Sequence, residues 1–248
     1  MKFMMFQLLS LLLAGAAVLP SCQKVEQGKV AEEAAILVFS KTAGFRHKSI
    51  EAGITAIKEL AQEHQVQVTA TEDAAYFVAD SLKQYKAVVF LNTTGDVLNQ
   101  AQEQAFEQYI QAGGGFAGIH AASDTEFEWP WFNKLVGAYF LDHPAVQPAA
   151  IDVLNKNHTS TSHLPDRWER TDEWYNFKSM NPDVQVLANL DEQTYKGGKN
   201  GDQHPIAWYH TFDGGRAFYT ALGHTNESYA EPLFRQHMWG GIRYAMGE

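Results

Sequence analysis

The sequence predicts an α/β fold with a doubly wound, mainly parallel sheet and helices on both faces. Continuous apolar runs, typical of strands buried on both faces, occur at residues 35–40, 87–91 and 116–119. Segments with apolar residues at helical spacing lie between these runs. Strands therefore alternate with helices along the first half of the chain, which is typical of parallel strands joined by right-handed crossovers.

The first strand is followed by a predicted helix whose apolar residues recur at helical spacing from Ile50 to Leu60. Ser49 is placed to cap the start of this helix, and serine is a preferred residue there. Residues 66–70 then predict a strand and residues 73–85 a helix, before the apolar strand at residues 87–91.

The next helix is predicted to begin at a capping box formed by Asn99 and Gln102 and to end at the glycines from Gly113 to Gly115. Gly113, Gly115 and Gly118 match the dinucleotide-binding fingerprint by letter. That motif must follow a strand and open a helix, whereas here it ends a helix and precedes a strand. We therefore interpret the glycines as a helix terminator.

The second half of the chain is less regular. It predicts short strands near residues 150–154 and 184–190, a hairpin of residues 205–212 and 216–222 joined at Asp213-Gly214-Gly215, and a final helix over residues 231–246.

The N-terminus predicts an exported lipoprotein. Residues 1–21 have one basic residue, Lys2, and a short apolar stretch, as in a secretory signal peptide. They end at Leu19-Pro20-Ser21-Cys22, which resembles a bacterial lipobox and predicts lipidation of Cys22, leaving the chain exported and lipid-anchored to a bacterial membrane, periplasmic or at the cell surface. Residues 22–33 predict a flexible tether, and residues 34–248 one domain. The formal net charge of −10 argues against a nucleic-acid partner.

Polar side chains follow the predicted strands where each one ends. They are Arg46 and His47 after the first strand, Asn92-Thr93-Thr94 after the third, His120 after the fourth, and His224 with Glu227 after the last. The carboxyl ends of strands in open α/β sheets form the usual ligand site. We therefore expect these groups to converge on one edge.

Six blocks of sequence together resemble the ThuA-like family, associated with trehalose utilisation. They cover Gly44 to Ile50, Gly118 to Thr125, Leu135 to Phe140, Asp172 to Tyr175, His204 to Trp208 and Ala221 to Tyr229. The resemblance implies a fold like that of class I glutamine amidotransferases, which is flavodoxin-like, and a carbohydrate substrate. It also implies a functional link to sugar dehydrogenases that make 3-keto sugars.

The resemblance places His120 where an amidotransferase has its nucleophilic cysteine. Cys22 is the only cysteine, so we expect no glutaminase activity. His224 and Glu227 look like a displaced counterpart of the amidotransferase His and Glu. Glu173 is a further candidate acid or base, because it lies between Asp172 and the aromatic pair Trp174-Tyr175.

The candidate catalytic residues are thus His120, His224, Glu173 and Glu227. Aromatic rings beside polar residues suit the C–H faces of sugars, although aromatic side chains also dominate protein cores. The candidate substrate-binding residues are Arg46, His47, Thr93, Asp124, His143, Trp174, Tyr175, His204 and Trp208.

Three functions remain open from the sequence. The first is acid–base processing of a glycoside or 3-keto-glycoside, by elimination, hydrolysis or isomerisation, with no cofactor. The second is a metal-dependent hydrolase, in which a divalent metal such as Zn²⁺ is bound by some of His47, His120, His143, His204 and His224. The third is a non-catalytic carbohydrate-binding module.

Overall fold

The described residues form a central sheet of nine strands, which lie side by side in the order β2-β1-β3-β4-β11-β10-β9-β6-β7. The computed structural model describes Met1 and residues 33–248. The predicted signal peptide, the lipidation site Cys22 and nearly all of the tether lie outside the described residues. None of the described helices is long and apolar enough to cross a membrane.

The five strands at one side of the sheet are parallel. They are β2 (Gln67–Thr71), β1 (Ala35–Phe39), β3 (Ala87–Leu91), β4 (Gly115–Ile119) and β11 (Gly215–Thr220). Four of them were predicted as strands of a parallel sheet, and the fifth, β11, as part of the terminal hairpin. The first strand β1 pairs with both β2 and β3, so successive strands are added on opposite sides of β1. The α/β prediction is confirmed.

The remaining four strands are antiparallel to their neighbours: β10 (Pro205–Phe212), β9 (Gln185–Leu190), β6 (Gln147–Val153) and β7 (Arg167–Asp172). The predicted hairpin joins β10 to β11, and its turn residues Asp213 and Gly214 have φ angles of 49° and 98°. Positive φ at both positions is the signature of the tight turns that match strand twist. A separate pair of strands consists of β5 (Tyr139–Asp142) and β8 (Asn176–Lys178).

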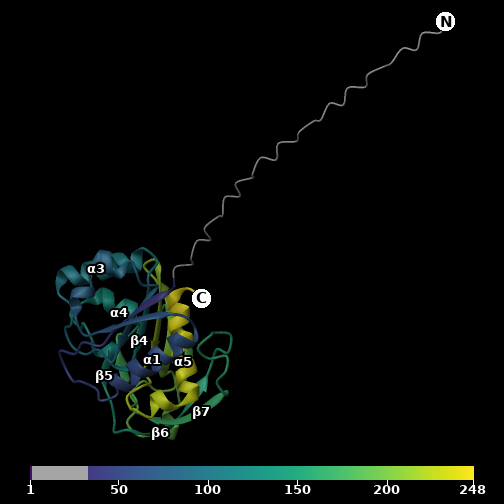
Figure 1. Cartoon of the computed structure of the whole chain (residues 1–248). Helices are drawn as coiled ribbons and strands as arrows, with labels where there is room; N and C mark the ends of the chain where they lie inside the picture. The colour runs from purple at the N-terminus through teal and green to yellow at the C-terminus, as the bar shows by residue number, and fades with distance from the viewer. Residues whose placement is uncertain (2–32) are drawn as a thin grey trace. The chain divides into compact units, whose positions relative to one another are not determined.

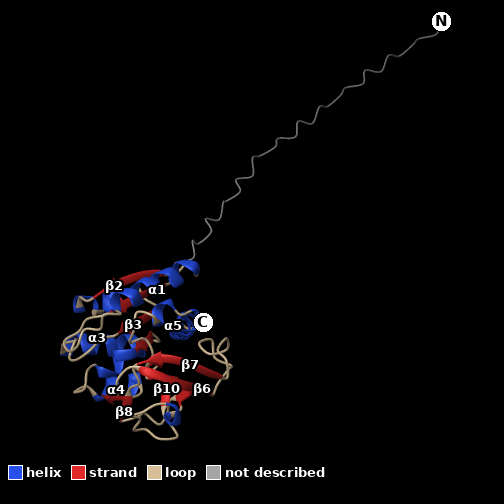
Figure 2. Ribbon diagram, turned by 90° about the horizontal axis from the view of Figure 1, so that it is seen from below, coloured by secondary structure: helices blue, strands red, loops and turns tan. Residues whose placement is uncertain are grey.

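Helices cover both faces of the parallel half of the sheet (Figure 1, Figure 2). One face carries α1 (Ile50–Glu63) and α5 (Pro232–Met246), and the other carries α2 (Ala79–Leu82), α3 (Gln100–Gln111) and α4 (Pro130–Val136). Residues 33–248 also form four 3₁₀ turns: η1 (Ala74–Tyr76), η2 (His120–Asp124), η3 (Glu192–Thr194) and η4 (Ser228–Ala230).

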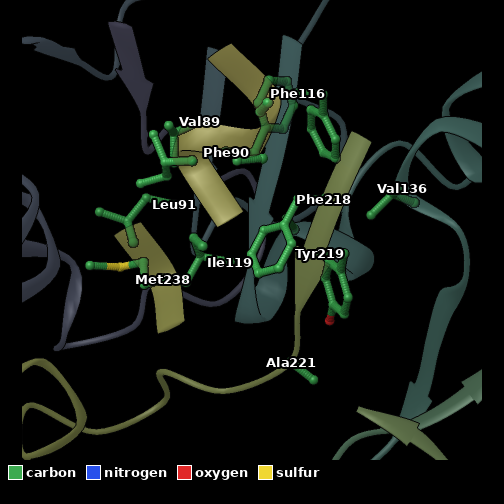
Figure 3. Packing of buried hydrophobic residues seen from close by; sticks show 14 of the residues in the cluster. Val89, Phe90, Leu91, Phe116, Ile119, Val136, Phe218, Tyr219, Ala221 and Met238 are labelled. Carbon is green, nitrogen blue, oxygen red and sulfur yellow. The ribbon is translucent and has the colours of Figure 1, made fainter. Parts of the chain in front are cut away.

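Buried side chains of β3, β4 and β11 form the core together with residues of the covering helices (Figure 3). On the face of α3, the ring of Phe90 stacks on Phe106 with centroids 5.5 Å apart. On the opposite face α5 lies so close to β4 that a Cβ atom at Gly115 would be 1.9 Å from the carbonyl oxygen of Ala245. Glycine is therefore required there, which gives one of the fingerprint-like glycines a packing role.

Two local predictions were wrong. The helix expected over residues 73–85 is divided into η1 and α2, because Val78 has an extended backbone and Phe77 is buried against Phe39 and Phe90. Ser49 does not cap α1; its hydroxyl donates to the carbonyl of Gly223. In both cases a long-range contact overrides the local preference. The capping box of Asn99 and Gln102 is confirmed.

Candidate metal and acid–base site

Four histidines and one glutamate meet beyond the carboxyl ends of the parallel strands. His47 lies in the loop after β1, His120 opens η2 directly after β4, and His224 follows β11. His143 follows β5, and Glu173 follows β7. We call these five residues the histidine–glutamate cluster. The three histidines expected to converge there, His47, His120 and His224, lie together.

Glu173 lies at the centre of the cluster. Its Oε2 is 3.0 Å from Nδ1 of His224 and 3.5 Å from Nε2 of His120, and its Oε1 is 3.0 Å from Nδ1 of His143. Burial alone would raise the pKa of the Glu173 carboxyl, but hydrogen bonds from His120 and His224 and their charges bring it well below its ordinary value. Glu173 is therefore an ionised acceptor at neutral pH.

His120 is oriented by the backbone of the neighbouring strand. Its Nδ1 is 2.6 Å from the carbonyl oxygen of Ala221, which can only accept, so Nδ1 carries a proton and Nε2 faces the cluster. That Nε2 is 3.3 Å from Nδ1 of His224. His120 also has a φ of 49°, a left-handed conformation that costs a residue with a Cβ atom about 1–2 kcal/mol. Such strain is concentrated at functional sites.

The pKa values of His47 and His224 shift in opposite directions. His47 is 4% exposed, its Nδ1 has no hydrogen-bond partner among the described residues, and its ring lies edge-on to those of His120 and His224 at 4.9 and 5.2 Å. Burial and the neighbouring histidines lower the pKa of His47 to about 3, so it is neutral. Burial would also lower the pKa of His224, but the hydrogen bond to Glu173 and the carboxylate's charge raise it.

Ligand atoms of His47, His120, Glu173 and His224 all lie within 4.8 Å of one another. Zn²⁺ with bonds of about 2.0–2.1 Å in tetrahedral geometry separates its ligand atoms by about 3.3 Å. The three separations among Glu173, His120 and His224 are 3.0, 3.3 and 3.5 Å. These three separations therefore fit a zinc-like divalent ion, and so does the nitrogen of His47 that no described residue hydrogen-bonds.

Two predicted substrate-binding residues border the cluster. The ring of Tyr175 lies on that of His120, with centroids 4.3 Å apart. Asp124, at the end of η2, is half-buried, and burial raises the pKa of its carboxyl to about 6 in spite of the opposing charge of His120. A carboxyl with a pKa near neutrality can give or accept a proton at physiological pH.

Other predicted residues do not join the cluster. The guanidinium of Arg46 forms ion pairs with Glu51 and Glu72 at 2.6 and 2.8 Å, on the exposed surface. Glu227 is exposed at the start of η4 and is not one of the groups that contact Glu173. Thr93 is fully buried, with its hydroxyl 2.8 Å from that of Thr125.

The expected sugar-stacking tryptophans are core residues instead. Trp174 and Trp208 are both fully buried, and their indole N–H groups donate to the carbonyls of Gln147 and Val136. Neither has an exposed face. His204 is also fully buried, held by Glu192 at 2.8 Å and by the carbonyl of Tyr175 at 2.8 Å, apart from the cluster. The ordinary packing role of buried aromatics thus holds at these positions.

Two residues that border the cluster had little signal in the sequence. Asp172 is fully buried beneath Glu173, and its adjacency to that glutamate was the only signal. Phe45 lies with its ring edge-on to His47 at 5.0 Å and is 66% exposed. An exposed phenylalanine beside buried histidines becomes noticeable only once its exposure is known.

The model of the family described as "ThuA: Trehalose utilisation" matches residues 35–245. Among solved structures, a ThuA-like protein from Bacteroides uniformis is similar with 26% identity and a TM-score of 0.73, covering 86% of this chain and 91% of that one. A second, from Parabacteroides merdae, has 20% identity and a TM-score of 0.72, covering 86% and 90%. A GMP synthase component from Thermoplasma acidophilum shares the fold, with 12% identity, a TM-score of 0.50 and coverage of 86% and 96%. A search of curated proteins finds no match.

Proposed function

The chain belongs to the ThuA family, and on that premise we propose that it is a metal-dependent enzyme that processes a glycoside or 3-keto-glycoside. The observation that carries the proposal is the set of ligand-like separations, 3.0 to 3.5 Å, among Glu173, His120 and His224. His47 would complete the set with its neutral imidazole. The geometry thus favours the metal-dependent alternative drawn from the sequence, but without His143 and His204 and with Glu173 added as a ligand.

A divalent ion bound there would act as a Lewis acid toward a carbonyl oxygen of the substrate. The first role of the chain is to orient the donors. The carbonyl of Ala221 fixes the tautomer and the ring of His120, as outer partners of metal-bound histidines commonly do. His143 holds Glu173 from the opposite side through Oε1.

Proton transfer would be carried out by groups near the cluster that do not bind the metal. In a 3-keto-glycoside the carbonyl acidifies the hydrogen on C2. When a base removes that proton, the C2–H electron pair forms the C1–C2 double bond, and the C1–O bond breaks with its electrons on the leaving oxygen, which takes a proton from an acid. Asp124, with its pKa of about 6, and His143, with a side chain 42% exposed, are the groups suited to these roles.

Acid–base catalysis by the cluster itself is the second candidate. It is favoured by the opposed pKa shifts of His224 and Glu173, which make them a hydrogen-bonded ion pair able to relay a proton. Because both carboxylate oxygens of Glu173 contact imidazoles, the relay could reach His120 or His143.

Metal analysis separates the two candidates. The purified chain is stripped with a chelator, dialysed against Zn²⁺ and assayed for bound metal and for turnover of a 3-keto-glycoside. We expect one Zn²⁺ per chain, turnover that depends on it, and loss of both in His224→Ala. The control His163→Ala removes a histidine outside the cluster, whose side chain hydrogen-bonds the carbonyl of Leu233. Turnover without metal would favour the relay, and metal without turnover would favour a sugar-binding module.

The location and partners of the chain are also proposals. The lipobox-like residues support export and anchoring of the chain through lipid on Cys22. The small-molecule partner would be a carbohydrate. A sugar dehydrogenase that oxidises a glycoside at C3 is the class of enzyme that would supply the substrate, and no nucleic acid is expected as a partner. The single cysteine argues against glutaminase activity.

A further inference from the structure

We propose that Asp172 is a positioning residue whose buried carboxylate clamps the backbone of Glu173 to the backbone of His224. The proposal rests on the proposed function, because it explains how two members of the donor set are held at their separation of 3.0 Å. Glu173 and His224 come from segments 51 residues apart in the sequence. Neither is part of a helix or strand, so nothing in the sheet itself fixes their relative position.

The carboxylate of Asp172 accepts hydrogen bonds from both segments. Its Oδ1 accepts from the backbone N–H of Glu173 at 3.0 Å and from that of His224 at 3.1 Å. Its Oδ2 accepts from the backbone N–H of Gly223 at 3.0 Å and from the hydroxyl of Ser228 at 3.3 Å. The Asp172 carboxylate thus binds three backbone amides, which belong to the two proposed metal ligands Glu173 and His224 and to Gly223 beside them.

A fully buried carboxylate needs a compensating charge. Arg170 supplies it, with Nη2 3.1 Å from Oδ2 of Asp172 and its own side chain 3% exposed. The guanidinium also contacts Glu231 at 3.3 Å, and its carbon lies 4.8 Å from the ring centre of Trp168. Because Arg170 reaches Asp172 through one nitrogen only, the other lone pairs of the carboxylate remain available to the amides.

Asp172→Asn discriminates this role because it is nearly isosteric. One face of the amide can still accept from Glu173 and His224, but the other would present an NH₂ group to the N–H of Gly223 and to the guanidinium of Arg170. Donors would then face donors, so the β11–η4 loop must shift relative to Glu173. Loss of partners that orient metal ligands typically costs about 10–100-fold in affinity or activity.

Glu231→Gln is the matched control. Glu231 contacts the same guanidinium and accepts from the indole N–H of Trp168 at 2.9 Å, but it touches no backbone group of Glu173 or His224. Both variants remove one carboxylate from the Arg170 network. Only Asp172→Asn breaks the clamp. If the effect is a general loss of stability, both variants should show it; if Asp172 positions the ligands, only Asp172→Asn should change metal binding.

The test measures Co²⁺ affinity, the visible absorption of bound Co²⁺ and thermal melting of the full chain. We expect Asp172→Asn to weaken Co²⁺ binding by about 10–100-fold and to change the spectrum, which reports ligand geometry. Glu231→Gln should leave affinity within about twofold and the spectrum unchanged. If Asp172→Asn does not fold, Arg170→Lys is measured, and the same change in spectrum with a smaller loss of affinity is expected. Equal affinities and spectra in variant and control would overturn the clamp.

Failure of the proposed function is a different outcome. If the wild-type chain binds no Co²⁺ or Zn²⁺, the metal site is refuted, and the clamp is judged from crystal structures of the wild type and Asp172→Asn. A separation of Glu173 and His224 beyond hydrogen-bond distance in the variant supports the clamp. An unchanged separation overturns it.

Discussion

The left-handed backbone of His120 makes a prediction about stability that is separable from catalysis. His120 has a φ of 49° at the end of β4. Asn92 occupies the equivalent position after the adjacent strand β3 with a φ of 51°, and asparagine tolerates this conformation better than most residues. Histidine is also found in this conformation more often than most residues, but any residue with a Cβ atom pays a strain there that glycine does not.

The perturbation is the pair His120→Ala and His120→Gly. Both variants lose the imidazole, its hydrogen bond to Ala221 and its contact with Tyr175, so these losses cancel in the comparison. Alanine keeps the left-handed strain of about 1–2 kcal/mol, whereas glycine removes it. Glycine in turn loses about 0.5–1 kcal/mol through the greater freedom of the unfolded chain. The net expectation is that the glycine variant is the more stable by about 0.5–1 kcal/mol.

Urea unfolding of both variants and the wild type measures this difference. The unfolding midpoints are compared on the assumption that all three have the same m-value, the dependence of the unfolding free energy on urea concentration. Turnover of a 3-keto-glycoside and Zn²⁺ binding are measured on the same preparations, and we expect both variants to lose them. If the alanine variant is more stable than the glycine variant, the backbone at residue 120 is not strained as argued. Retained turnover in either variant would refute a catalytic or metal-binding role for His120.

Three further outcomes test other parts of the molecule. Burial raises the pKa of Glu126 from 4.5 to about 7, so stability falls as the pH rises through that interval. Glu126→Gln should therefore gain up to about 3 kcal/mol over the wild type at pH 8 and little at pH 4.5 in urea unfolding. A gain independent of pH would contradict this assignment. Phe45→Ala removes a 66% exposed ring beside His47, and we expect KM to rise by about 3- to 10-fold with kcat nearly unchanged. An unchanged KM would exclude Phe45 from substrate contact. Cys22→Ser should release the chain from membranes into the soluble fraction, because lipid on Cys22 supplies the anchor. Retention in the membrane fraction would refute the lipoprotein proposal.

Much of the fold is predictable because its signals are local. The apolar runs of β1, β3 and β4 require burial on both faces, and the capping box at Asn99 satisfies its own backbone whatever lies around it. The turn at Asp213-Gly214 likewise depends on backbone angles that few residues accept. The expectation over residues 73–85 failed because burial of Phe77, a long-range contact, outweighed helical spacing.

The sequence by itself determined that His47, His120 and His224 would lie at one edge of the sheet, because parallel strands bring their carboxyl ends together. Only the tertiary structure decided that Glu173 and His143 join them while Glu227 and Arg46 do not. These residues lie outside the parallel half or in irregular loops, where no periodicity fixes which way a side chain points. Their directions follow from contacts between segments far apart in the chain, such as the hydrogen bonds of Asp172 to Glu173 and His224.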